Sequence, residues 1–254
     1  MQHLLSYVRR CVQDYDMLAE GDYVAVGVSG GKDSLTTLLV LKALSGFYPQ
    51  HFDVRAISID MGFPGADFSP IAALCERIEV PFTVVPTQIY ELVFNVRQEK
   101  NPCSLCANMR RGALNRAAIA HGCNKVALGH HRDDAVETFL LSEFYEGRIA
   151  CFQPVTFLDR SGVTLIRPML YVPEKEMRAF ARRQELPVFP RLCPQEGNSR
   201  HAEVKTLIAS LREKNPDLSE LLFGAIQRSS LPGWREPSPR KFIKPKEHRD
   251  ETSD

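Results

Sequence analysis

The sequence lacks the features that would place it outside the ordinary folded domains. No apolar run approaches the ~20 residues that a membrane-spanning helix needs, and no segment repeats. The stretch from Met1 to Met17 alternates apolar with charged residues and has no apolar stretch of the kind a secretory signal carries. The 32 basic residues are balanced by 31 acidic ones, so net charge alone does not indicate a nucleic-acid partner. We therefore expect a cytoplasmic protein without membrane contact.

The sequence also lacks the even number of cysteines that a disulfide framework would need. An odd number without a secretory signal favours a reducing compartment, where metal ligands, free thiols or redox chemistry are more common than a disulfide framework. The seven cysteines are Cys11, Cys75, Cys103, Cys106, Cys123, Cys151 and Cys193. Those at 11, 75, 123 and 151 have no partner at a useful spacing, and we expect them to be small, packed apolar residues.

What is present is an alternation of short β-branched strands with helices. Strands are expected at 22–28, 52–60, 81–85, 125–129 and 165–169. Helices are expected at 1–20, 35–44, 69–78, 104–121, 133–145, 174–184 and 217–228. This alternation predicts an α/β fold, a doubly wound parallel sheet with helices on both faces, in which ligands bind outside the carboxyl ends of the strands.

The length of 254 residues suits one large domain with smaller additions. We expect an N-terminal helix over 1–20, the main domain over 21–190 and a C-terminal helical segment over 191–230. The remainder, 231–254, is rich in proline and charge and is predicted to be a flexible tail.

A glycine-rich loop follows the first expected strand and reads Ser29-Gly-Gly-Lys-Asp-Ser34. Glycine lets the backbone approach a ligand closely, and the helix that follows presents unpaired N–H groups to an anion. The loop is not of the Walker A type, because no glycine stands four residues before a Gly-Lys-Ser. A plain strand-to-helix turn is the simpler interpretation. The polar residues directly after an apolar strand favour a phosphate-binding loop.

A second polar segment, Leu128 to Thr138, follows the fourth expected strand. Its acidic residues Asp133, Asp134 and Glu137 lie within about one helical turn. Acids there stabilise a helix dipole in any protein, and carboxylates are also the ligands that Mg²⁺ prefers. The segment thus predicts either a simple helix start or a Mg²⁺ site, with His130 or His131 as a base, a stacking group or a surface residue.

Two cysteines stand at a metal-binding spacing. Cys103 and Cys106 are three residues apart at an expected helix start, so they share a face. The pair alone is compatible with a redox centre, half a zinc site or part of an iron–sulfur site. A closed zinc site needs four ligands, and the chain has no second C-x-x-C. Cys193, far along the chain, remains, and three thiolates with an open fourth position suit a [4Fe–4S] cluster.

These motifs resemble the PP-loop enzymes, or N-type ATP pyrophosphatases, and among them the tRNA 2-thiocytidine synthetase family. The resemblance runs from about Asp22 to Arg228 and rests on SGGKDS, CSLCANMRRG, ALGHHRDDAVET, RPMLY, EKEMR and the late Cys193. It implies an adenine nucleotide α-hydrolase-like fold and ATP that is cleaved, with Mg²⁺, between its α- and β-phosphates. The AMP half would activate the C2 oxygen of a cytidine at position 32 of the tRNA anticodon loop. Sulfide on an open iron of the cluster would then replace that oxygen and give 2-thiocytidine.

The same resemblance assigns roles to individual residues. Phosphates and nucleotide would be bound by Ser29, Gly30, Gly31, Lys32, Asp33, Ser34, Asp60, Gly129, His130, Asp133 and Asp134. The expected catalytic residues are Asp33, Arg110 and Asp134, and the expected cluster ligands are Cys103, Cys106 and Cys193. Arg110 and Arg111 follow Cys106 by about one turn, where they would steady developing charge or grip RNA phosphate, although a solvated helix face is the simpler interpretation.

Partners implied by the resemblance are tRNA and a sulfur donor such as a cysteine desulfurase, and a homodimer is left open. The run after Cys193 departs from the family pattern, and the extra cysteine pairs of 2-thiouridine enzymes are absent. Three other hypotheses stay open: a thiolase that uses a cysteine persulfide or another base, a lysidine-type synthetase that needs no cysteine, and a non-catalytic iron–sulfur sensor that binds nucleotide.

Overall fold

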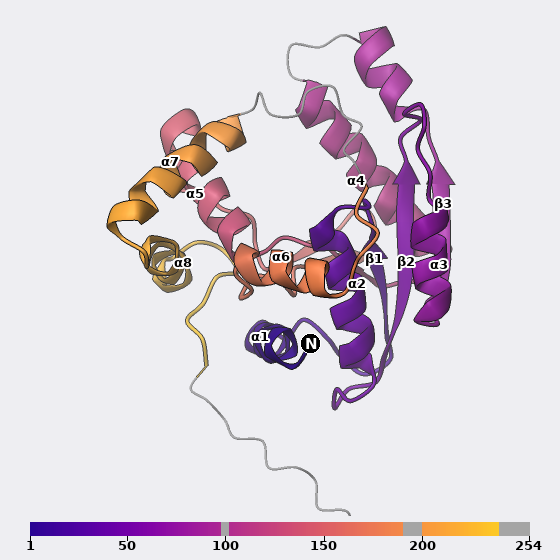
Figure 1. Cartoon of the computed structure of the whole chain (residues 1–254), viewed down its shortest axis with the longest axis horizontal. Coiled ribbons are helices and arrows are strands. Elements are labelled where there is room, and N and C mark those ends of the chain that lie inside the picture. The colour runs from indigo at the N-terminus through magenta and orange to yellow at the C-terminus, as the bar shows by residue number, and fades with distance from the viewer. Residues whose placement is uncertain (98–101, 190–199, 239–254) are drawn as a thin grey trace, which may run out of the picture.

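A six-stranded sheet organises the computed structural model, which describes residues 1–97, 102–189 and 200–238 (Figure 1). The strands lie in the order β3-β2-β1-β4-β6-β5. Their bounds are β1 Asp22–Gly27, β2 Phe52–Asp60, β3 Phe82–Pro86, β4 Lys125–Ala127, β5 Val155–Leu158 and β6 Val163–Ile166. The chain moves outward from β1 in one direction to β3 and then returns to its other side with β4, so the carboxyl ends of β1 and β4 meet at a switch point where ligands bind in such sheets.

Every neighbouring pair of strands is parallel except β5 and β6. The predicted α/β fold with a parallel sheet is therefore confirmed, with one addition at the edge. Val155 faces Ile166 in an antiparallel hairpin that the sequence analysis missed. The turn uses Gly162 at a φ of +65°, a conformation that glycine adopts without strain.

The helices match most of the expected segments. They are α1 Gln2–Asp14, α2 Lys32–Ser45, α3 Ser69–Arg77, α4 Pro102–Ala120, α5 Arg132–Glu146, α6 Glu174–Arg183, α7 Arg200–Lys214 and α8 Leu218–Arg228, with a π-helix η1 over Glu91–Arg97. Among the described residues, none of these helices has the length and hydropathy needed to cross a membrane.

Alternation along the strands builds a core on each face of the sheet. Val24 and Val26 of β1 join the larger core, which also holds the buried faces of α1, α2 and α6. Ala25 points to the opposite face, where Leu114 and Ala118 of α4 cover it. The sheet is thus covered on both faces, and α4 is the helix that covers the face opposite α2.

The C-terminal helices belong to the larger core. Figure 1 shows α5, α7 and α8 together, on the side of the molecule away from α3 and β3. The prediction of a flexible tail from residue 231 onward is wrong for residues 231–238. Trp234 is only 6% exposed and donates its indole N–H to the carbonyl oxygen of Phe152 at 3.0 Å. Its ring also meets Tyr15 and Phe223 edge to face. The remaining tail residues, 239–254, lie outside the described residues.

Candidate active site

The phosphate loop connects β1 to α2 and leaves the start of that helix open. The N-cap residue of α2 is Gly31, which has no side chain to cap the helix, so the first-turn N–H groups are left to an anion. The loop is folded on itself by Ser34, whose hydroxyl accepts the Ser29 N–H at 3.1 Å and lies 2.9 Å from the Gly31 carbonyl oxygen, to which it donates. The sequence prediction of a strand, a glycine loop and a helix is confirmed in this segment.

Gly30 allows Phe189 to approach the backbone of the loop closely. Its φ is +80°, and a Cβ atom placed on it would lie 2.6 Å from the ring of Phe189. The N–H of Phe189 also donates to the Gly30 carbonyl oxygen at 3.0 Å. The chain just before residue 190 therefore packs on the phosphate loop, a contact that no sequence pattern predicted.

Gly129 brings the second polar segment against the loop. A Cβ atom there would lie 3.1 Å from the carbonyl carbon and oxygen of Asp33 and from the hydroxyl of Thr37. Because these are mainly backbone atoms, only glycine fits without a shift of α2. The two segments that sequence analysis singled out at different strand ends are thus in contact.

His131 fixes the start of α5. Its Nδ1 accepts the Asp134 N–H at 3.4 Å, and Asp134 accepts the His131 N–H at 2.8 Å, which makes a reciprocal capping box. In the neutral ring the proton then resides on Nε2, which lies 3.8 Å from a carboxylate oxygen of Asp33. This buried histidine is a helix cap that faces the loop, rather than a surface residue.

The three acids of α5 do not form the single Mg²⁺ site that their spacing suggested. Asp133 accepts the Glu174 N–H at 2.7 Å and lies 3.5 Å from Arg212, so it joins α5 to α6 and α7. Glu137 lies 3.8 Å from Lys205. Asp134 stays with His131 beside Asp33, while Asp133 lies 4.0 Å from His131 and is bonded on its other side to α6. Over 1–97, 102–189 and 200–238, no three Asp, Glu, His or Cys side chains are grouped in a way that would hold a metal ion.

Burial and mutual repulsion disturb two of these carboxyl groups. Burial raises the pKa of Asp134, and the Asp33 carboxylate adds to this, while His131 and Lys32 act against it. Burial also raises the pKa of Glu137 to about 7, and the acids around it, Asp134 first, add to the shift against the opposing charge of Lys205. A cation placed at Asp33 and Asp134 would relieve this repulsion.

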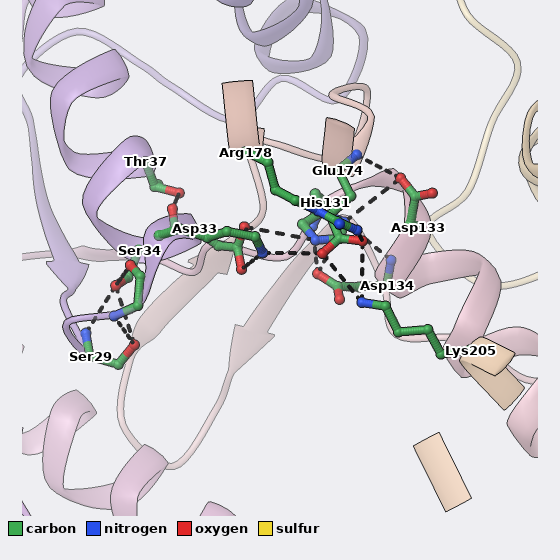
Figure 2. Close-up of polar contacts among 12 residues, drawn as sticks. Ser29, Asp33, Ser34, Thr37, His131, Asp133, Asp134, Glu174, Arg178 and Lys205 are labelled. Atoms are coloured by element: carbon green, nitrogen blue, oxygen red, sulfur yellow. Dashed lines mark hydrogen bonds and ion pairs between the residues drawn. The ribbon is translucent and has the colours of Figure 1, made fainter. Parts of the chain in front are cut away.

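Glu174 is a site residue that the sequence analysis did not assign. Its carboxylate accepts from Arg178 at 2.6 Å and lies 3.2 Å from the ammonium groups of both Lys32 and Lys205. Burial works to raise its pKa, but these three cations outweigh burial and lower the pKa to about 2. Through this carboxylate, Lys32 and its partner Asp33 in the loop are joined to Lys205 of α7. Figure 2 shows Asp33, Glu174 and Lys205 in this arrangement. The only sequence signal was its position in the EKEMR run.

The cysteine pair lies in the first turn of α4. Cys103 is exposed and Cys106 is half-buried, three residues apart on a helix, so both thiols share one face. Two thiolates at this spacing fit a soft metal or an iron–sulfur cluster. The third expected ligand, Cys193, lies outside the described residues.

The cysteines without a partner spacing behave differently. Cys11, Cys75 and Cys123 are buried, as predicted for packed apolar residues. Burial raises the pKa of the Cys75 thiol to about 11 and that of the half-buried Cys151 to about 12. Neither thiol is set up for ionisation, unlike a catalytic or ligating cysteine.

The other expected site residues occupy separate places. Arg110 and Arg111 are exposed on α4, about one turn beyond Cys106. The His130 ring stacks on Phe152, with centroids 4.9 Å apart, and burial lowers its pKa to about 3, with Arg167 contributing. Its buried Nδ1 finds no hydrogen-bond partner among the described residues. Asp60 ends β2 and accepts the Gly62 N–H at 2.9 Å.

Comparisons with known proteins agree with this geometry. The sequence profile of the PP-loop domain matches residues 4–189. A tRNA-cytidine(32) 2-sulfurtransferase of Geobacter metallireducens is 38% identical over 93% of this chain and 90% of its own length. A protein of the same name from Syntrophotalea carbinolica is 38% identical over 85% of each chain. The chain therefore belongs to the PP-loop family, within the group of tRNA-cytidine(32) 2-sulfurtransferases.

A solved structure shares the fold. It is the U34-tRNA thiolase NcsA from Methanococcus maripaludis with its [4Fe-4S] cluster, at a TM-score of 0.70 and 24% identity, covering 88% of this chain and 77% of that one. At this identity the likeness concerns the fold alone.

Proposed function

We propose that this chain is an ATP-dependent tRNA thiolase that converts cytidine 32 to 2-thiocytidine. The observation that carries the proposal is the contact between the open start of α2 and the segment after β4, made possible by Gly129, in a chain whose relatives bear that name. In the first half-reaction, ATP would be cleaved between its α- and β-phosphates, and the AMP half would form a bond to the C2 oxygen of the base. Sulfur would then replace that oxygen, and AMP would leave.

The loop residues Ser29 to Ser34 are assigned to the β- and γ-phosphates, because uncapped N–H groups and the Lys32 ammonium offer positive charge. Asp33 and Asp134 would hold Mg²⁺ together with phosphate oxygens, an arrangement that suits an ion which keeps few protein ligands. Asp60, Gly129 and His130 remain assigned to the nucleotide side of the site. Asp133 is reassigned to the structural contact with α6 and α7 described above.

The cysteine face of α4 is assigned to the sulfur chemistry. Cys103, Cys106 and Cys193 would hold a [4Fe–4S] cluster, which when bound supplies an iron with an open position for sulfur. Arg110 would act beside it on the developing negative charge of the reacting base. The tRNA substrate and a sulfur donor such as a cysteine desulfurase are the partners that this reaction needs.

Nucleoside mass spectrometry of tRNA from a strain without this gene tests the proposal. We expect 2-thiocytidine to disappear and to return when the intact chain is supplied, while a chain with Asp33→Ala fails to restore it. Normal 2-thiocytidine in the deletion strain would overturn the assignment.

A further inference from the structure

Glu174 lies where the phosphate loop meets a helix from outside the matched domain. The PP-loop profile ends at residue 189, whereas Lys205 and Arg212 belong to α7. These two cations are seven residues apart, about two turns, so they project from the same face. Lys205 contacts the Glu174 carboxylate, and Arg212 contacts Asp133, which in turn accepts the Glu174 N–H. Thus α7 holds both the side chain and the backbone of Glu174.

We propose that Glu174 is a positioning residue for ATP cleavage: it sets the place of the Lys32 ammonium, and α7 holds it for that task through Lys205. The proposal rests on the proposed function, because it assumes that ATP reacts at the loop. Lys32 is the residue that would touch the phosphates, and Glu174 acts through it.

The physical argument begins with the flexibility of lysine. A four-carbon stem carries considerable rotamer freedom, and the ammonium is a point charge without a preferred direction. Lys32 lies between two carboxylates, 2.8 Å from Asp33 and 3.2 Å from Glu174, which restrict it to one position. Glu174 stays ionised while buried, because Arg178 and Lys205 also balance its charge. The carboxylate therefore remains an anchor for Lys32 when phosphate binds beside it.

The negative charge of Glu174 predicts how ATP binding and turnover change when this carboxylate is removed. A carboxylate near the phosphates repels them, so its removal does not weaken ATP binding. Its removal does free Lys32, and a loosely held group supplies less stabilisation in the transition state. The expected signature is a lower kcat with an unchanged or lower KM for ATP. A residue needed only for folding would instead lower the unfolding temperature and the fraction of active protein, leaving KM and the turnover of folded enzyme unchanged.

The experiment measures AMP formation by the full-length, cluster-loaded enzyme with tRNA, Mg²⁺ and varied ATP, together with thermal unfolding. Glu174→Gln is expected to lower kcat about tenfold without raising KM. The matched control is Glu176→Gln, in the same turn of α6, whose carboxylate lies 3.5 Å from His3 instead of facing the loop. Both constants should stay at the parent values in the control.

Lys205→Met provides the second variant, with Lys214→Met at the end of α7 as its control. Because Lys205 is half-exposed and Arg178 stays in place, we expect a fall in kcat of roughly threefold. A parent kcat in folded Glu174→Gln, or a raised KM with kcat unchanged, overturns the proposal. If Glu174→Gln does not fold, a parent kcat in Lys205→Met overturns it. An absence of AMP formation by the unaltered chain would instead contradict the proposed function itself.

Discussion

The phosphate-loop region and the first turn of α4 hold their functional side chains in different ways. Around the loop, Lys32, Asp33 and His131 have partners from three different helices and are at least partly buried. In the first turn of α4, by contrast, Cys103 is exposed and Cys106 is half-buried. Folding alone therefore sets the loop residues in place, whereas the cysteine site that we propose would be completed only by a metal and by Cys193. The two halves of the reaction should be separable by substitution.

The largest effect is expected at the cysteines. Cys106→Ala should remove most of the bound iron and abolish thiolation, because cluster ligands act as a unit and single losses are not graded. The measurements are iron content, the visible absorbance of an anaerobic preparation, and thiolated tRNA. ATP binding should persist, since the loop is a separate element.

The control for that variant is Cys75→Ala, which removes a buried thiol in α3 and should keep both iron and activity. Full thiolation in Cys103→Ala, Cys106→Ala or Cys193→Ala would contradict the three-cysteine cluster.

The reciprocal variant is Asp33→Ala. Loss of this carboxylate removes a partner of Lys32 and an expected Mg²⁺ ligand, so AMP formation should fall by on the order of 10³-fold. The iron–sulfur absorbance should be unchanged. A loss of iron in this variant would show that the two regions are not independent.

Arg110 tests the cysteine region from its own helix. Arg110→Ala should lower single-turnover thiolation about 100-fold with the cluster retained, because the guanidinium faces the reacting base in our assignment. Arg110→Lys keeps the charge but loses the planar fork, so it should restore part of the rate. Arg116→Ala, further along α4, is the matched control. A parent rate for Arg110→Ala at saturating tRNA would remove this residue from the mechanism.

Glu137, near the phosphate-loop region, should affect how the stability of the folded protein depends on pH. Its pKa rises from 4.5 to about 7 on folding, so the folded state holds a proton that the unfolded chain loses. Stability is then fully present below about pH 4.5 and declines as the pH rises through 7. Glu137→Gln should remove this decline, making the variant more stable than the parent by about 2 kcal/mol at pH 8, with little difference at pH 4.5. Thermal unfolding at the two pH values decides it, with Glu143→Gln on the same helix as the control.

How far the sequence predicted the molecule depends on how local each cause was. The loop Ser29–Ser34 and the strand-helix alternation are local patterns, so both were found. The capping box of His131 with Asp134 is also local, but histidine is not one of the residues usually found at an N-cap, so the pattern did not indicate it. The separation of Asp133 from Asp134 depends on α6 and α7, which only the tertiary fold brings near. Glu174 was visible as part of a motif, but its task required the placement of Lys32 and Lys205. The tail prediction included Trp234 because it rested on the proline and charge content of the segment, and such a composition does not indicate that one ring is buried.

The smallest effect is expected for residues 239–254, which follow the part of the expected tail that the structure describes. Trp234 is buried and donates its indole N–H to the carbonyl oxygen of Phe152, so the chain is packed at least as far as this ring. A chain that ends at Ser238 keeps this packing, so its unfolding temperature should equal that of the parent.

Such a chain loses five basic residues, Lys241 and Lys244 among them, together with four acidic ones. We expect these basic residues to add only salt-sensitive, sequence-independent attraction to RNA. We therefore expect a modestly weaker affinity for tRNA at low salt, little difference at high salt, and an unchanged single-turnover rate at saturating tRNA. A collapsed rate in the chain ending at Ser238 would mean that residues 239–254 take part in the chemistry of one of the two regions, because neither packing nor bulk attraction would account for it.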